Sequence, residues 1–150
     1  MKNLFEPECV EEVKARCATL RPDSEHQWGK MNPAQAMAHC TASLELAMGD
    51  RKPPRLLIGR LIGGVIKPKA LGDDAPLRRN VPTIKELVML DERNLNKERG
   101  QLLIIIDRFA AGGRAGCTSH PHSFFGRLAQ EEWALLMCKH LDHHLRQFGA

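Results

Sequence analysis

The sequence predicts an all-α protein, a four-helix bundle with a short extra helix or cap between the second and third long helices. Four separate segments carry apolar residues at three- and four-residue steps, the period of an amphipathic helix. No segment reads as a strand with a second strand to pair with. The chain has 150 residues, a length that buries a core without disulfide support, so we expect a single domain over residues 1–150.

The first two helices have the clearest local signals. The first is expected over residues 7–20, where apolar residues recur at helical spacing with charges between them. The second begins after Asn32, which can cap it, with Pro33 at the first helical position and Gln35 as the capping-box partner. We expect it to run to about Met48, where the sequence GDRKPP stops it.

The next stretch, RLLIGRLIGGVIKPKALGDDAPLRRNVP, is rich in glycine and proline. Its apolar part is shorter than the roughly 18 to 20 residues that a membrane-spanning helix needs. It predicts a short amphipathic helix and a long loop packed over one end of the core. Association with a membrane surface is the alternative, and the lack of a dense basic run in the flanking loop argues against it.

The third and fourth long helices follow. The sequence TIKE is a capping-box signature, so the third helix is expected to start at Thr83 and to stop at AGG. The letters LLIII within it would suit a strand, but the charged helical pattern around them favours a buried helical segment. The last helix is expected over residues 129–148. Short or irregular joins between the four predict an antiparallel-type bundle.

Two histidines of the last helix share its buried face. His140 and His144 follow the phase of the apolar residues, whereas His143 falls about 100° away on the wetter side. Side chains at i and i+4 stack on one helix face, and two imidazoles at that spacing can bind one metal ion. The alternative is a pair of partly buried polar residues that neighbouring groups satisfy.

A third ligand has to come from another helix. His39 lies in the middle of the second helix among apolar residues, where a solvated imidazole is not expected. A buried imidazole without a partner costs on the order of 1–3 kcal/mol, so a shared metal would account for all three histidines. A site built on Cys40 or Cys138 is the weaker alternative, because each lies about 100° around its helix from the nearby histidine.

These residues carry a family resemblance. WGKMNPAQAMAHC, followed downstream by HPHSFFGRL and KHLDHHLRQFG, resembles the DinB/YfiT-like metalloenzyme superfamily, in a bacterial branch catalogued as a domain of unknown function. The resemblance extends over nearly the whole chain. It implies a four-helix bundle that binds a divalent metal, usually zinc or nickel, through three histidines. Carried over to this sequence, those positions are His39, His140 and His144.

The other histidines have weaker assignments. His120 and His122 lie in a loop that is expected to return to the open end of the bundle, where they could line a pocket or simply follow the turn at Pro121. His143 would be a surface residue or would support the site from beside it. We assign no catalytic residue, because no acidic side chain near the metal-bearing stretches has the phase of a general base.

Two function classes follow from this site. The first is a metal-dependent enzyme, with transfer of a low-molecular-weight thiol favoured over hydrolysis, since relatives implied by the resemblance include both. The second is a non-catalytic bundle that binds metal or a small ligand, for example in a stress response. Three histidines leave a coordination position open, which is the arrangement of catalytic zinc.

The composition of the chain argues against some classes of binding partner. The net charge of +4 is spread along the chain and only 5% of residues are aromatic, which argues against nucleic-acid binding. Five cysteines form no CxxC pair, and the first residues lack the apolar core of a signal peptide, so we expect free thiols and a cytoplasmic protein. The expected partner is a small-molecule substrate or thiol, without a membrane; a homodimer is left open.

Overall fold

The computed structural model describes residues 1–150, and all of its regular elements are helices, with no strand. This confirms the predicted all-α bundle and the extra helix between its second and third long helices. The elements are α1 (Pro7–Thr19), α2 (Pro33–Met48), α3 (Leu57–Leu71), α4 (Leu95–Gly112) and α5 (Gln130–Gln147), with short 3-10 turns η1 (Lys85–Leu87) and η2 (Arg114–Gly116).

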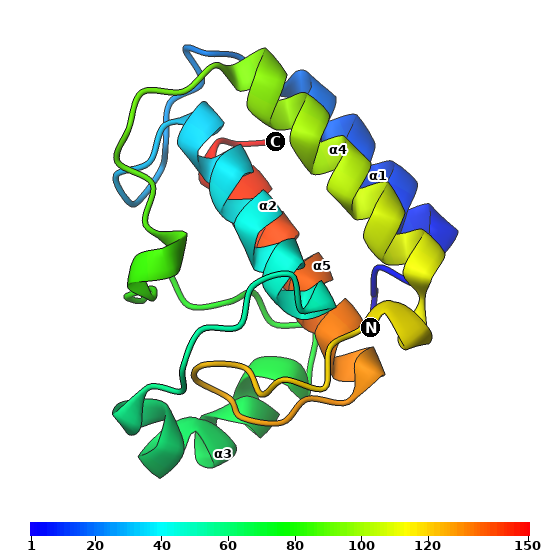
Figure 1. Cartoon of the computed structure of the whole chain (residues 1–150). Coiled ribbons are helices and arrows are strands. Elements are labelled where there is room, and N and C mark those ends of the chain that lie inside the picture. Colours follow the sequence, from blue (N-terminus) through cyan, green and yellow to red (C-terminus); the bar gives the residue numbers. More distant parts are fainter.

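Four helices form the bundle, and α3 lies across one end of it (Figure 1). In the bundle α2 packs against α4 and α5, and α1 packs against the same two helices. Figure 1 shows that α2 and α4 run in the same direction, opposite to α1 and α5. The helices are therefore not antiparallel throughout, contrary to the prediction from the sequence. The reason is the long connection over residues 49–94, which returns the chain to the end of the bundle where α2 begins.

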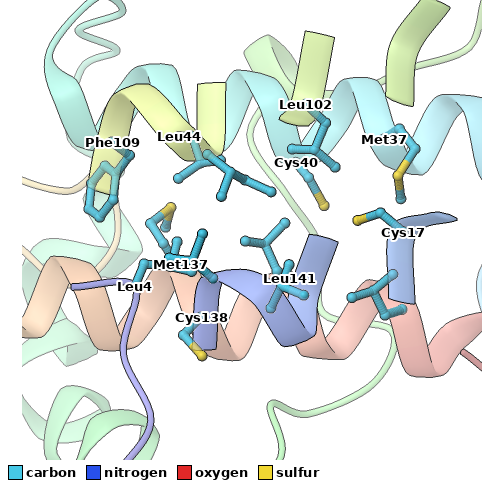
Figure 2. Close-up of a cluster of buried hydrophobic side chains, with 14 of the residues drawn as sticks. Leu4, Cys17, Met37, Cys40, Leu44, Leu102, Phe109, Met137, Cys138 and Leu141 are labelled. Atoms are coloured by element: carbon cyan, nitrogen blue, oxygen red, sulfur yellow. The ribbon is translucent and has the colours of Figure 1, made fainter. Parts of the chain in front are cut away.

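The core lies between these four helices, where each contributes fully buried side chains (Figure 2). Cys17, Met37, Leu102 and Leu141 come from α1, α2, α4 and α5, and each is at most 2% exposed. Burying a side chain of leucine or methionine size stabilises the fold by about 1.5–3 kcal/mol. The buried thiol of Cys17 is free and behaves here as a small apolar group.

The third long helix starts later than the sequence predicted. Thr83 does not cap a helix; the chain makes the single turn η1 and then extends to Asn94, whose side chain accepts from the backbone N–H of Lys97 and caps α4. The early start was wrong because Ile84 and Leu87 pack in a small apolar cluster against α2. That packing outweighs a capping box, which is typically worth about 1 kcal/mol.

Helix α3 packs through its glycines rather than its large apolar residues. A side chain at Gly59 or Gly63 would collide with the backbone of Phe124, so the helix can approach that loop only where it has no Cβ. Leu57 and Leu61 lie on the opposite face and are 78% and 79% exposed. The helix does cap one end of the bundle, as expected. None of the helices combines the length and apolarity that crossing a membrane requires.

Candidate metal centre

Three histidines from two helices meet between α2 and α5. His39 lies near the middle of α2, while His140 and His144 lie one turn apart on α5. One ligand atom from each lies within 4.8 Å of the others, and the Nε2 atoms of His39 and His140 are 3.0 Å apart. The helical phase read from the sequence and the packing of α2 against α5 thus bring all three imidazoles to one point.

Local sequence features set the direction of each helix. Asn32 and Gln35 form the predicted capping box at the start of α2, which fixes the beginning of the helix that carries His39. At the start of α5 the carboxylate of Glu132 accepts from the backbone N–H of Ala129. Each bond satisfies a donor that the first turn of a helix leaves free, so both helix starts are well defined.

The ring of His39 is held by a backbone carbonyl. Its Nδ1 lies 2.8 Å from the carbonyl oxygen of Leu87, at the end of η1. A carbonyl oxygen can only accept, so Nδ1 carries the proton and donates. The Nε2 atom is then left with a free lone pair directed at the other two histidines. This is the outer hydrogen bond that metal-binding histidines usually make, and it fixes both tautomer and ring orientation.

The ring of His144 is held through a chain of two hydrogen bonds. The side-chain Nε2 of Gln147 donates to the carbonyl oxygen of Trp28 at 2.7 Å, which places the Oε1 of Gln147 against His144 Nδ1 at 2.9 Å. Since Oε1 can only accept, His144 Nδ1 carries the proton. Its Nε2 is therefore unprotonated, and it is the free ligand atom of this ring.

Burial keeps the three rings neutral. Loss of solvent lowers the pKa of His39, and it lowers the pKa of His144 to about 3, with the neighbouring His39 as the next cause. Burial, followed by the charges of His144 and His39, lowers the pKa of His140 well below its ordinary value. Neutral imidazoles are the form that binds metal, so these three are ready to act as ligands near neutral pH.

The donor set fits a zinc-type ion. Three nitrogens bound tetrahedrally at about 2.0–2.1 Å lie roughly 3.3–3.4 Å from one another. The ligand atoms here all lie within 4.8 Å of one another, and the His39–His140 pair is 3.0 Å apart, so small side-chain rotations bring them to that spacing. His39 and His144 are 4% and 7% exposed, whereas His140 is only partly buried. His140 is therefore the least covered of the three rings.

His143 lies beside the cluster, where it is half-buried. The indole N–H of Trp28 donates to its Nε2 at 3.3 Å, and its ring centroid lies 5.0 Å from that of His144. Burial lowers its pKa, an effect that a hydrogen bond with the backbone of Leu77 opposes. Its Nε2 accepts from the indole, so the ring is held beside His144 and outside the group of three histidines.

His120 and His122 are outside the cluster and hold loops. The Nε2 of His120 donates to the carbonyl oxygen of Pro53 at 2.9 Å. The Nδ1 of His122 accepts from the backbone N–H groups of Phe124 and Phe125, both at 3.1 Å, and burial lowers its pKa to about 4. Both histidines line only a small crevice of about 10 Å³. The loop structure accounts for them.

The two cysteines considered as alternative ligands are directed elsewhere. Cys40 is buried in the core, where desolvation raises the pKa of its thiol well above the ordinary value. Cys138 is turned toward α1, with its Sγ atom 2.7 Å from the Sγ of Cys9. Neither belongs to the group of ligand atoms around His39. The centre is therefore a histidine site.

Three supporting groups were not identified from the sequence. Gln147 lies three residues after His144 on the same helix, so its helical spacing was a usable signal. The carbonyl of Leu87 and the backbone and indole of Trp28 gave no such signal, because they reach the site from loops distant in the chain. Helical phase predicts which residues face inward and does not predict what a loop will bring to them.

The comparisons with known proteins give a family and no function. Neither the curated proteins nor the solved structures include a match to this chain. Residues 5–150 match one protein-family model, described as "Protein of unknown function (DUF1569)". The match spans nearly the entire chain, including all three histidines of the cluster. The chain therefore belongs to the DUF1569 family.

Proposed function

We propose that this protein is a metal-dependent enzyme acting on small molecules, with one divalent ion, zinc or nickel, held by His39, His140 and His144. One observation carries the proposal: three neutral imidazoles converge within 4.8 Å, and two of them have Nδ1 fixed by hydrogen bonds so that Nε2 is directed inward. Such outer hydrogen bonds are typical of metal-binding histidines.

The ligand number supports a catalytic rather than a structural site. Three protein ligands leave a coordination position for water or substrate, whereas structural zinc sites use four. A divalent ion there supplies Lewis acidity, which lowers the pKa of water to about 7 or stabilises a thiolate. The three histidines would hold the ion. Leu87 orients the ring of His39, Gln147 orients the ring of His144, and His140 is the least covered of the three.

The reaction we favour is transfer of a low-molecular-weight thiol, ahead of hydrolysis. The support is the resemblance of the histidine-bearing segments to the DinB/YfiT-like superfamily, whose members include both kinds of enzyme. A low-molecular-weight thiol with a pKa of about 8.5 can release its proton to solvent as the ion stabilises the thiolate, and no acidic side chain belongs to the cluster. Hydrolysis by contrast would have to move a proton with few groups available for it.

A second candidate is a bundle that binds metal or a small ligand without catalysis. The burial of His39 and His144 favours it, because a covered ion exchanges ligands slowly. Turnover separates the two candidates. A catalytic centre predicts a metal-dependent reaction between a thiol and an electrophile such as chlorodinitrobenzene, whereas a binding protein predicts metal uptake with no such reaction.

The experiment that tests the metal centre is elemental analysis of protein purified without an affinity tag, followed by calorimetric titration with zinc chloride and nickel chloride. We expect one ion per chain in the wild-type protein and its loss in His140→Ala. His120→Ala is the matched control, since His120 lies outside the cluster, and it should keep the ion. Failure of the wild-type protein to bind either metal with histidine-dependent stoichiometry would exclude the proposal.

A further inference from the structure

A cavity of about 500 Å³ lies beside the histidine cluster, near the C-terminal end of α5. This volume is within the range of roughly 300–1,000 Å³ that small-molecule sites occupy. The walls include Trp28, Leu77, Arg79, His143 and Arg146. None of the three proposed metal ligands lines the cavity, so the metal centre does not account for it.

Two arginines and an aromatic side chain line the cavity, and its wall also includes the C-terminal residue Ala150, whose oxygen accepts from Arg16. The guanidinium of Arg79 lies 3.9 Å from the centroid of the Trp28 ring, and Arg79 is in none of the ion pairs of the structure. Arg146 approaches the carboxylate of Asp142 at 3.7 Å, but Arg16 holds the other oxygen of that carboxylate at 2.8 Å. One acidic group is thus shared by two arginines, and the charge of Arg79 is left without a partner.

The wall of the cavity is connected to the histidine cluster. His143 lines the cavity, and its ring centroid is 5.0 Å from that of His144. Gln147 bonds to the Trp28 carbonyl on one side and to His144 on the other. A molecule in the cavity would therefore lie one side chain away from a proposed metal ligand.

We propose that this cavity binds a small anionic molecule, whose carboxylate or phosphate is held by Arg79 and Arg146 while an apolar part lies against Trp28. The planar guanidinium fork matches both kinds of anion, and an arginine already stacked on an indole loses little freedom on binding. If the bound anion is the substrate of the metal centre, this inference rests on the proposed function.

The indole of Trp28 provides the signal for a binding test. The chain has two tryptophans, so Trp133→Phe leaves Trp28 as the only one. In this background, metal-free protein is titrated at constant ionic strength with succinate, with inorganic phosphate and with uncharged succinamide. We expect a saturable change in Trp28 fluorescence with at least one of the two anions and none with succinamide. The anion that changes the fluorescence of Trp28 at the lower concentration is the preferred one.

Two variants that remove the same charge test whether Arg79 is responsible for anion binding. Arg79→Gln should weaken anion binding at least about tenfold, because it removes a charge-assisted contact. Arg60→Gln removes the same charge from the exposed surface of α3 and should leave binding unchanged. A response to succinamide as large as the response to the anions, no response to either anion, or equal behaviour of the two variants would each overturn the inference.

The same titration in His140→Ala separates this inference from the proposed function. We expect that variant to lose the metal and keep the Arg79-dependent anion response, since His140 does not line the cavity. If the wild-type protein binds the anion but no metal, the anion site in the cavity is supported and the proposed metal-dependent function is refuted. If it binds metal but shows no Arg79-dependent response, the metal centre stands and the anion site is wrong.

Discussion

Replacing Gln147 by Met tests whether the second hydrogen-bonded layer holds the metal ligand in place. Gln147 is 2% exposed, and its amide bonds on one side to His144 Nδ1 and on the other to the carbonyl of Trp28. Methionine is also uncharged and has a similar length and volume, but it can form neither of these two hydrogen bonds. The substitution therefore removes the two bonds and leaves the packing nearly unchanged.

The expected loss of metal affinity follows from the role of such bonds. Removing the outer partner of a metal-binding histidine typically costs 10–100-fold in affinity. At about 1.4 kcal/mol per tenfold, this corresponds to roughly 1.4–2.8 kcal/mol of binding free energy. The metal-free protein should also lose about 1–3 kcal/mol of stability, because a buried N–H and a buried carbonyl are left unpaired.

The assay is competition calorimetry with zinc, together with urea unfolding of the metal-free protein. Ile106→Val is the control, since Ile106 is fully buried on α4 and the change should cost about 0.5–1.5 kcal/mol of stability without touching the site. If Gln147→Met binds zinc as tightly as Ile106→Val, the hydrogen-bond chain does not orient His144 and the reasoning fails.

Three further predictions follow. His144→Ala should abolish or severely weaken zinc binding, whereas His143→Ala should cost on the order of tenfold, because the ring of His143 supports the cluster from outside it; calorimetry showing the reverse order would contradict the proposed ligand set. The pKa of His122 is lowered to about 4, so the unfolded chain binds more protons between about pH 6.5 and 4, and stability is lost as the pH falls through that window. From pH 7 to 5 this amounts to on the order of 2 kcal/mol, which His122→Asn should remove in urea titrations; an unchanged pH dependence would refute it. Gly63→Ala should destabilise the protein by about 1–3 kcal/mol because its Cβ would meet loop backbone, whereas Gly64→Ala, with nothing within 4 Å, should stabilise the helix by about 0.5–1 kcal/mol in thermal unfolding; similar shifts for the two would contradict the packing of α3.

The sequence by itself determined the helical segments and the faces that they bury. The phase of α5 placed His140 and His144 together on its inner side, and the same reasoning placed His39 inside α2. These are properties of a single helix, and the i and i+4 spacing fixes them before any tertiary contact forms. The capping box at Asn32 is equally local, and the structure has it where the sequence predicted it.

The tertiary structure decided everything that depends on contacts between distant segments. No helix starts at Thr83, because Ile84 and Leu87 pack against α2 instead. The same packing places the carbonyl of Leu87 against the ring of His39 and orients it. The orientation of α3 was likewise set from outside the helix. Its amphipathic pattern predicted a short helix over one end of the core, and Gly59 and Gly63 allow the closest approach to the 124–125 loop, so its large apolar residues are turned outward.

The supporting groups of the site belong to the same category. Trp28 reaches His143 directly and His144 through Gln147, across more than a hundred residues of chain. Periodicity along one helix contains no information about which loop will cover it, because that choice depends on backbone hydrogen bonds and packing that form only when the helices are assembled. The three imidazoles were therefore predictable from the sequence, whereas the groups that orient them and the arginine-lined cavity beside them were not.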